Sequence, residues 1–437
     1  MKTNLLKILT KANFAVTSIL LLCYGIIRYK VAFLRPEAKG DENSFLKMFN
    51  FFSENGYSEA LAKGNSILFN LVASFVDFFA SNPLFSLRIT SLLFGILTIY
   101  MVLKIQKKFF SFDNKSYRNL AWITSVNVLI VSSILFLGIN DTILYFLTAL
   151  FFYYFLHLIQ NTTAVKYYIY LGIIYGLMLI TRKFGIIYLL PILVVLFLFF
   201  RNERLQWKQV IKNASILFLS SILIVAAANF NNLTQGKGLS FNEKELDDEI
   251  NWIQLQYLTA LKNSQGELAY GKHVSVEDVK QYIKENGEDS LPENSMVSSI
   301  FFDLGFTIKQ SFRNVLTQTV PITRLTGILL MFIVLALLFN LRNKVKLKLP
   351  NKQYILIFSF VYILSLCFIV ISYVEPRWYV SVLVLMPLPI LKLLEKSIEK
   401  NKNKEVLSFL MINAALLAFI AMNAKYVITN FKEIIPF

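Results

Sequence analysis

Two acidic positions flank hydrophobic segments and could supply a catalytic base. Asp41 and Glu42 follow the first hydrophobic segment of the chain within a few residues, and Asp141 directly precedes another one. A carboxylate beside a bilayer core is costly, so its presence there usually reflects a function. A carboxylate can take the proton of a hydroxyl group, which is general-base catalysis. For Asp141 a simpler role is to cap a helix N-terminus, and the two roles are compatible.

Two short cationic turns could hold an anion. Thr181-Arg182-Lys183 lies between two strongly apolar segments, and Glu375-Pro376-Arg377-Trp378-Tyr379 precedes a third. Arginine pairs with phosphate through a planar fork and lysine through a point charge. The alternatives are that Arg182 and Lys183 extend to lipid headgroups, and that Glu375 and Arg377 pair with each other within an interfacial aromatic belt.

Together these groups fit one kind of reaction. Transfer of a sugar from a lipid phosphate needs a carboxylate that takes the proton from an acceptor hydroxyl. It also needs cations that stabilise the negative charge developing on the departing phosphate. The carboxylate and the cations must both reach one sugar at the membrane edge. Whether they can do so depends on the elements that position them.

The composition indicates that these elements are membrane helices. Hydrophobic residues make up 56% of the 437 residues and charged residues 16%, against about 25% charged in soluble domains. Backbone groups in lipid must be bonded within their own segment, and the sequence has no short alternating strands, so we predict an all-α polytopic protein. About 20 apolar residues cross a bilayer, which gives eleven predicted spans: 12–33, 83–103, 119–138, 141–159, 165–181, 184–200, 213–230, 322–341, 353–373, 378–394 and 405–424.

Charge predicts the orientation of the spans. The N-terminus and the connections 104–118, 160–166, 201–212, 342–352 and 392–404 hold 23 of the 44 Lys and Arg residues in about 70 positions. By the positive-inside rule this side, with the N-terminus, is cytoplasmic. The Asp41 segment and residues 231–321 are then extracytoplasmic. The net charge of +17 is mostly a topology signal, and we expect no nucleic-acid partner.

Three regions follow from this pattern. Residues 1–230 form a seven-helix catalytic module with a first outer loop at 34–82, 231–321 form a small, mainly helical extracytoplasmic domain, and 322–437 add four more helices. Ser275-Val276-Glu277-Asp278 predicts a capping box in the small domain. In the first outer loop, polar residues of 66–81 recur at helical spacing, which predicts a helix lying at the interface or a short span.

The order of these features resembles the multispanning glycosyltransferases that use polyprenyl-phosphate sugars, a fold shared by protein O-mannosyltransferases and the lipid A aminoarabinose transferase. The resemblance covers about 13–200 well and 375–392 more weakly. It rests on Asp41-Glu42 with Phe45 and Glu54-Asn55-Gly56-Tyr57, Leu87-Arg88-Ile89-Thr90-Ser91-Leu92-Leu93-Phe94-Gly95, Asp141, Gly176-Leu177-Met178-Leu179-Ile180-Thr181-Arg182-Lys183 with Pro191, and Arg377-Trp378-Tyr379 with Pro387. Gly64-Asn65-Ser66 replaces the paired prolines often found after the first loop.

The resemblance implies roles for these residues. Asp41 is the expected catalytic base, and Glu42 supports it or binds a cation. Arg182, Lys183 and Arg377 are expected to hold the donor phosphate, with Asp141 as an additional acidic residue. Some relatives use a divalent metal, and oxygen ligands from Asp41, Glu42 and Asp141 suit Mg²⁺ or Mn²⁺. Arg88 is expected to be structural.

The predicted function is that of an inverting glycosyltransferase, a hexosyl- or pentosyltransferase. It would act at the extracytoplasmic face of a bacterial-type plasma membrane. The donor would be a polyprenyl-phosphate-linked monosaccharide, and the acceptor a protein, lipid or cell-surface glycan. A transporter or flippase of lipid-linked sugars and a catalytically inactive relative are the alternatives. For an enzyme, we expect Asp41 and Arg182 or Lys183 to face one cavity.

Overall fold

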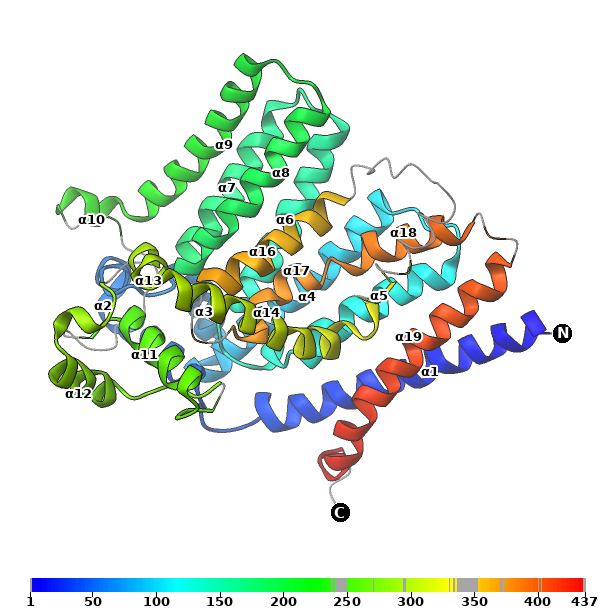
Figure 1. Ribbon diagram of the computed structural model, residues 1–437, viewed down its shortest axis with the longest axis horizontal. Coiled ribbons are helices and arrows are strands. Elements are labelled where there is room, and N and C mark those ends of the chain that lie inside the picture. The colour runs from blue at the N-terminus through cyan, green and yellow to red at the C-terminus, as the bar shows by residue number, and fades with distance from the viewer. Residues whose placement is uncertain are drawn as a thin grey trace.

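The chain folds into a bundle of long helices with a smaller helical region at one end, as a computed structural model shows (Figure 1). The structure describes residues 2–434 except 237–238, 240–249, 270, 294–295, 330, 333–334, 336–352, 370–371, 373, 400 and 402. Within these described residues every regular element is a helix and no strand occurs, which confirms the predicted all-α class.

The first half of the chain supplies most of the long helices. They are α1 (Lys2–Arg28, extended by a π-helical turn at Tyr29–Phe33), α2 (Asp41–Ala62), α3 (Ile67–Ala80), α4 (Pro83–Phe109), α5 (Lys115–Val131), α6 (Asp141–Gln160), α7 (Val165–Thr181), α8 (Leu189–Asn202) and α9 (Trp207–Ala228). Short 3₁₀ turns at Ile134–Phe136 and Lys183–Tyr188 precede α6 and α8.

The second half begins with short helices and ends with long ones. They are α10 (Phe230–Thr234), α11 (Trp252–Gln265), α12 (Val276–Asn286), α13 (Met296–Phe302), α14 (Leu304–Thr326), α16 (Tyr354–Ile369), α17 (Val380–Leu383), α18 (Pro387–Glu399) and α19 (Lys404–Thr429). A 3₁₀ turn, Pro376–Tyr379, leads into α17; two others lie at Glu288–Ser290 and Phe431–Glu433.

Six described helices are long and apolar enough to cross a membrane, and a seventh is added if the bent pair Pro376–Leu383 and Pro387–Glu399 is one span. The predicted total of eleven is therefore not confirmed. Three of the other predicted spans coincide with shorter or less apolar helices, namely α5, α7 and α16. The span predicted at 322–341 lies only partly within the described residues.

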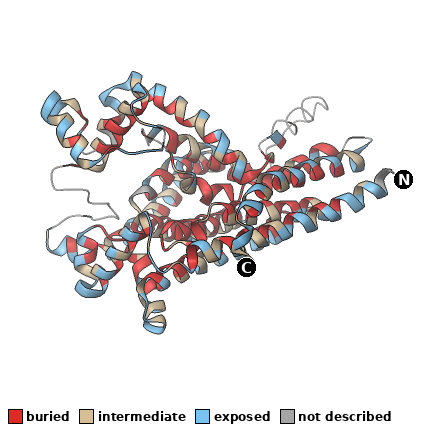
Figure 2. Cartoon of the chain, turned by 90° about the horizontal axis from the view of Figure 1, so that it is seen from below, coloured by how far each residue is buried: buried red, intermediate tan, exposed pale blue. Residues whose placement is uncertain are grey.

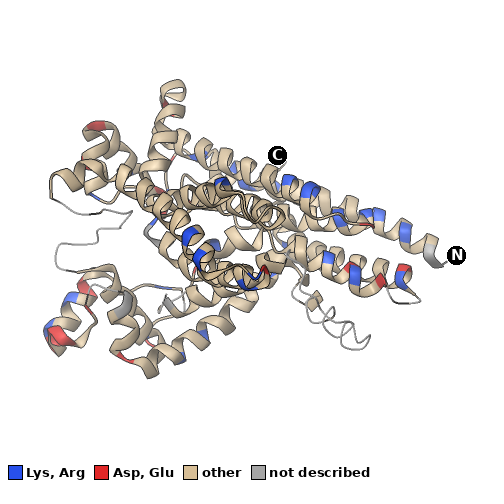
Figure 3. Cartoon of the chain, turned by 90° about the horizontal axis from the view of Figure 1, so that it is seen from above, with Lys and Arg blue, Asp and Glu red and all other residues tan. Residues whose placement is uncertain are grey.

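The bundle is held together by close helix pairs. Helix α7 packs along α9, α4 along α6, and α1 along α19 near the two ends of the chain, and these pairs lie side by side in Figure 1. Gly172 lets α7 approach α9 closely, because a Cβ atom there would lie 2.1 Å from the carbonyl oxygen of Leu217. Buried residues fill the interior of the bundle (Figure 2), and its long helices have extended stretches without charged residues (Figure 3).

The first outer loop is not an irregular loop. Asp41 and Glu42 form the first turn of α2, which Gly40 precedes with a φ of 59°. The helix predicted at 66–81 is present as α3 and packs mainly against α4. Its polar face points inward, since Asn70 is buried and Asp77 accepts a 2.7 Å hydrogen bond from Ser86. Its phenylalanines 75, 78 and 79 are exposed.

The small domain has a core of its own. Leu258, Val279 and Leu291 belong to an apolar cluster contributed by α11, α12 and the segment after α12. The predicted capping box is confirmed, because Ser275 and Asp278 exchange hydrogen bonds between side chain and backbone. Helix α14 extends past the predicted domain boundary at 321 and contacts α5 and α16 of the bundle.

Candidate active site

Five charged side chains from four separate parts of the chain meet at one end of the bundle. Asp41 begins α2 and Asp141 begins α6, while Arg182 directly follows α7. Glu375 and Arg377 flank the start of the Pro376–Tyr379 turn. We call these five residues the outer cluster. Up to 336 positions separate its members along the chain, so only the packing of the helices brings them together.

Arg377 is the centre of the outer cluster. Its guanidinium pairs with the carboxylate of Asp41, and its Nε lies 2.5 Å from Oε2 of Glu375. Its Nη1 lies 3.8 Å from Oδ2 of Asp141, whose other oxygen pairs with Arg182. Through Arg377 and Asp141, the predicted base Asp41 and the predicted phosphate ligand Arg182 therefore belong to one connected set of charges.

The outer cluster contains more carboxylates than guanidinium groups. Its three carboxylates face two guanidinium groups, so it carries one surplus negative charge when all are ionised. Burial raises the pKa of Glu375, and the charges of Asp41 and Asp141 raise it further against the opposing effect of the two arginines. Asp41 is the most accessible member, with 31% of its side chain exposed against 2% for Asp141. Glu375 follows with 26% of its side chain exposed, so Asp41 and Glu375 are the two accessible carboxylates of the outer cluster.

Aromatic residues fix the backbone around Arg377. The hydroxyl of Tyr145 donates a 2.8 Å hydrogen bond to the carbonyl of Arg377, and Tyr362 donates one of 3.0 Å to the carbonyl of Trp378. The Trp378 ring lies against the guanidinium of Arg182, whose Cζ is 5.9 Å from the ring centroid. These contacts fix the Pro376–Tyr379 turn, and both arginine side chains are only 11% exposed.

A buried polar node holds Asp141 and Arg182 in place. The Asn140 side chain donates to the carbonyl of Thr181 at 2.9 Å and to the hydroxyl of Ser66 at 3.0 Å. Ser66 in turn donates to the same carbonyl at 2.9 Å. Because Asn140 and Thr181 are the residues directly before Asp141 and Arg182, this node ties together the chain at α3, α6 and α7 where the pair forms.

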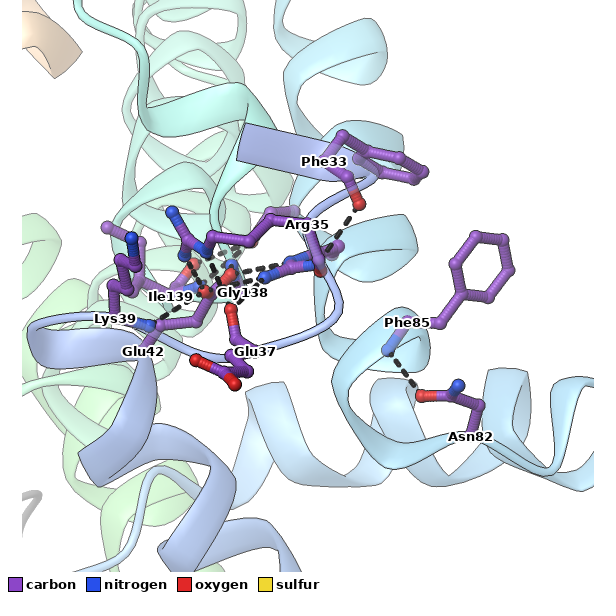
Figure 4. Close-up of polar contacts among 11 residues, drawn as sticks. Phe33, Arg35, Glu37, Lys39, Glu42, Asn82, Phe85, Gly138 and Ile139 are labelled. Carbon is purple, nitrogen blue, oxygen red and sulfur yellow. Dashed lines mark hydrogen bonds and ion pairs between the residues drawn. The ribbon is translucent and has the colours of Figure 1, made fainter. Parts of the chain in front are cut away.

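Glu42 occupies a different environment from its neighbour Asp41. Its carboxylate receives both Nε and Nη2 of Arg88, at 2.8 and 2.9 Å, and lies 2.5 Å from Arg35. The backbone amide of Gly138 donates to it at 2.9 Å. Figure 4 shows these contacts beside the chain that enters α2. We call Glu42, Arg88, Arg35 and the Gly138 amide the buried clamp.

Arg88 completes the buried clamp by binding backbone. Its Nη1 donates to the carbonyl of Phe33 at 3.0 Å and also to that of Arg35, and its Nη2 donates to Glu37 at 3.1 Å. It thereby fixes the segment between α1 and α2 onto α4, which agrees with the structural role expected for it. Burial would raise the pKa of Glu42, but the hydrogen bonds from Arg88 and Gly138 and the nearby cationic charges hold it below its usual value.

The residues predicted for a metal do not form a three-carboxylate site. The oxygens of Glu42 are occupied by arginines and an amide, and Asp41 and Asp141 each pair with an arginine. Within the described part of the chain, the one group of three carboxylates with oxygens inside 4.8 Å of one another is Asp113, Glu395 and Glu399. Lys392 already pairs with Asp113 and Glu395. Of the three predicted metal ligands, Asp41 and Asp141 could bind a Mg²⁺ or Mn²⁺ ion in exchange for their arginines.

The cavity beside the outer cluster is smaller than predicted. It measures about 10 Å³ and is lined by Asp141, Arg182, Tyr145, Tyr188, Tyr362, Trp378 and two leucines, without Asp41. That is room for about one water molecule, not for a sugar. The ion pairs of Arg377 occupy the space between Asp41 and Arg182, so a sugar can enter only if some of these pairs separate. The side chain of Lys183 lies outside the described residues.

Some members of this site were not among the predicted site residues. Glu375 was read as a partner for Arg377, and that pair is present. Ser66 and Asn140 carried no signal in the sequence beyond their proximity to other polar positions. Their common partner is a backbone carbonyl, which no residue pattern reveals.

Comparison with known proteins supports the predicted resemblance. Residues 65–229 match the family described as dolichyl-phosphate-mannose-protein mannosyltransferase. This part of the chain is thus similar to enzymes that use polyprenyl-phosphate sugars. The match spans less than half of the chain; it includes Arg88, Asp141 and Arg182 but not Asp41 or Arg377. No curated protein and no solved structure matches the chain.

Proposed function

We propose that this protein is an integral-membrane glycosyltransferase that moves a monosaccharide from a polyprenyl-phosphate donor to a hydroxyl acceptor with inversion at the transferred carbon. The acceptor would be a protein, a lipid or a cell-surface glycan. The outer cluster would lie at the extracytoplasmic face of a plasma membrane, with the N-terminus in the cytoplasm.

The observation that carries the proposal is the convergence of Asp41, Arg182 and Arg377. A base and two phosphate ligands were expected from three distant segments, and all three side chains belong to one set of ion pairs. The similarity of residues 65–229 to dolichyl-phosphate-mannose-protein mannosyltransferases supports the donor class.

The ion pairs also suggest how the donor is received. A phosphate that binds Arg377 competes with Asp41 for the same guanidinium, because both are oxyanions that suit its planar fork. Once the phosphate takes that place, Asp41 is released as a base with an accessible carboxylate. Arg182, which has Asp141 as its partner, would stabilise the charge that builds up on the phosphate as the sugar leaves.

Inversion sets a geometric requirement. The acceptor oxygen attacks the sugar carbon from the side opposite the phosphate, so base and phosphate ligands must lie on opposite sides of the ring. Asp41 and Arg377 are in direct contact and must move apart by about the width of a sugar before transfer. The reacting atoms would then be about 3–3.5 Å apart.

The proposal is tested by transfer from a synthetic polyprenyl-phosphate sugar to water-soluble or lipid acceptors, using purified protein in nanodiscs. Asp41→Asn should lower the transfer rate by about 10²–10⁴-fold, the usual contribution of a general base, and the product should have the inverted configuration. Asp289→Asn, at an exposed position of the small domain, is the matched control.

Two outcomes would contradict the proposal. Full activity in Asp41→Asn would remove Asp41 as the base. Donor binding without transfer in the native protein, for every acceptor class, would favour the alternative of a transporter or flippase, or an inactive relative.

The proposed orientation has its own test: a cysteine at Ser264 should react with an impermeant thiol reagent on intact cells, and labelling only after lysis would reverse it.

A further inference from the structure

Helix α14 buries polar residues and exposes apolar ones, the reverse of a helix in a water-soluble domain. Five large apolar residues follow one another at four-residue spacing along it, and all are exposed: Leu304, Ile308, Phe312, Leu316 and Val320. The opposite side is polar and buried: Thr307, Gln310, Ser311, Asn314 and Gln318 are each at most 3% exposed. A polar inner side and an apolar outer side are expected where the surrounding medium is lipid rather than water.

The buried side of α14 has polar partners. Gln310 donates to the carbonyl of Ala260 at 3.4 Å, and Arg313 donates to that of Asn263 at 3.2 Å, both on α11. Gln318 accepts a 2.5 Å hydrogen bond from Tyr379, two residues after Arg377. The orientation of α14 is therefore fixed by specific contacts, and the exposure of its apolar side is a consequence of the fold.

The charge of α14 also differs from that of its surroundings. Residues 231–321 hold 13 Asp and Glu against 8 Lys and Arg. Helix α14 itself contains Lys309, Arg313 and Arg324 and no acidic residue. A helix with an apolar face and only positive charges is attracted to an anionic bilayer surface.

An open groove of about 710 Å³ lies where α14 meets the end of α11. Lys309 and Arg313 line it together with the apolar side chains of Phe312 and Leu316, and residues 263–266 form the other wall. This volume is within the range that holds an organic ligand. Cations beside exposed apolar side chains suit a ligand with a phosphate at one end and a hydrocarbon chain at the other.

We infer that α14 is an interfacial helix whose groove with α11 binds the headgroup of an anionic phospholipid, with the acyl chains lying along the apolar row from Leu304 to Val320. Helix α3 shows the same inversion independently, with Asn70 buried and Phe75, Phe78 and Phe79 exposed. The two helices would set the depth at which this end of the bundle sits in the leaflet. The inference does not depend on the proposed transfer activity.

The burial of the apolar row is measured on the full-length protein in phosphatidylcholine vesicles. Cys23 and Cys367 are replaced by alanine, and a nitroxide is attached to a cysteine at Phe312 or Leu316. Leu219, exposed on α9, and Glu277, exposed on α12, give lipid and water controls. We expect the labels at 312 and 316 to collide with oxygen, which dissolves in lipid, more than with a water-soluble nickel complex. The label at 219 should behave in the same way, and the label at 277 should show the opposite preference. Access to the nickel complex would overturn the inference, and so would protection from both, which would indicate a protein partner or a second copy.

The headgroup site is measured by adding phosphatidylglycerol to the same vesicles and following the mobility of the label at 312. Lys309→Gln should raise, by about fivefold, the phosphatidylglycerol content at which the label mobility has changed by half. This factor is what one basic residue contributes near an anionic surface. Lys272→Gln, exposed in the small domain but outside α14, should leave it unchanged. Equal effects of the two substitutions, or the same response to inorganic phosphate alone, would overturn the headgroup assignment.

Discussion

Two neighbouring carboxylates, Asp41 and Glu42, occupy opposite kinds of site. Glu42 lies in the buried clamp, where a bidentate Arg88, Arg35 and the Gly138 amide all stabilise its charge. Asp41 lies in the outer cluster, where it shares Arg377 with two further carboxylates and keeps 31% of its side chain exposed. One residue along a helix turns a side chain by about 100°, and that is enough to place the two carboxylates in different environments.

The difference shows how an acidic pair beside a membrane can divide its roles. A buried carboxylate with all its oxygens satisfied is fixed in position and cannot accept another proton or ligand easily. A carboxylate in a cluster with surplus acid has partners that can be exchanged for a phosphate. In the proposed reaction, the buried clamp would hold the start of α2 while the outer cluster rearranges.

The largest effect on stability is expected in the buried clamp. Arg88→Met should lower the free energy of unfolding by about 3–5 kcal/mol, because it leaves a buried carboxylate without its main partner. Denaturant unfolding of the purified protein in micelles measures this, and Arg118→Met, at an exposed position, provides the control. An unchanged midpoint would mean that the buried clamp does not hold α2.

The outer cluster should respond in activity rather than stability. Arg182→Gln should reduce transfer by about 10²–10³-fold, the usual loss when one group that stabilises a developing oxyanion is removed. Its unfolding midpoint should fall less than that of Arg88→Met, because Asp141 keeps Arg377 nearby. Lys104→Gln serves as the matched loss of one cation at a distant site. If Arg182→Gln retains native transfer, Arg182 does not bind the donor phosphate.

A smaller effect is expected for the polar node that positions the outer cluster. Ser66→Ala removes the hydrogen bond from Ser66 to the Thr181 carbonyl and also the hydroxyl that accepts from Asn140, while Asn140 still donates to that carbonyl. Because a buried donor loses an acceptor, the loss in stability should be about 1–3 kcal/mol. Transfer should weaken through donor affinity and not through the rate at saturating donor. Steady-state kinetics at varied donor concentration separates the two, and a change confined to the saturated rate would argue against a positioning role.

The smallest expected effect is a difference between the buried clamp and the outer cluster in how stability depends on pH. The pKa of Glu42 is lowered, so the stability that it contributes is present above its unfolded value and is lost as the pH falls through its folded value. The pKa of Glu375 is raised, so its contribution is present below the unfolded value and is lost as the pH rises through the folded value. Glu375→Gln should therefore match or exceed the native stability at neutral pH, by less than about 1 kcal/mol.

Melting temperatures of both proteins between about pH 5 and pH 8, all above the unfolded pKa of about 4.3 for glutamate, check this expectation. The advantage of Glu375→Gln should shrink toward the acid end, because the raised pKa of Glu375 brings it closer to protonation there. A destabilisation of Glu375→Gln that is as large at pH 5 as at pH 8 would show that Glu375 acts through its shape and not through its charge.

The parts of this arrangement that follow from composition were predictable from the sequence. The helical class, the capping box at Ser275 and the helix at 66–81 depend on local pattern, and the structure contains them. Arg182 and Arg377 could be singled out because cations between apolar segments are unusual, and the structure places both in one set of ion pairs; their role toward a phosphate stays a prediction. The resemblance implied Asp41 as the base with Glu42 supporting it. That Glu42 is buried against Arg88 and Gly138 could not be inferred, because it depends on how α2 packs against other elements.

Two features were beyond local pattern for a different reason. The polar stretch 231–321 was predicted to be a small, mainly helical extracytoplasmic domain; its last helix, α14, continues to Thr326 and exposes its apolar side. Its average composition hides this inversion, which only the direction of each side chain reveals. The number of membrane-crossing helices likewise depends on the length and bending of each helix, as the break between Leu383 and Pro387 shows.

The central claim is that donor phosphate replaces Asp41 as the partner of Arg377. A structure of the full-length protein with a non-transferable polyprenyl-phosphonate sugar tests it most directly. We predict that the phosphonate binds the guanidinium groups of Arg377 and Arg182, that Asp41 no longer contacts Arg377, and that the sugar lies between them with the Glu42–Arg88 pair unchanged. An intact Asp41–Arg377 pair with the phosphonate bound elsewhere would contradict the claim.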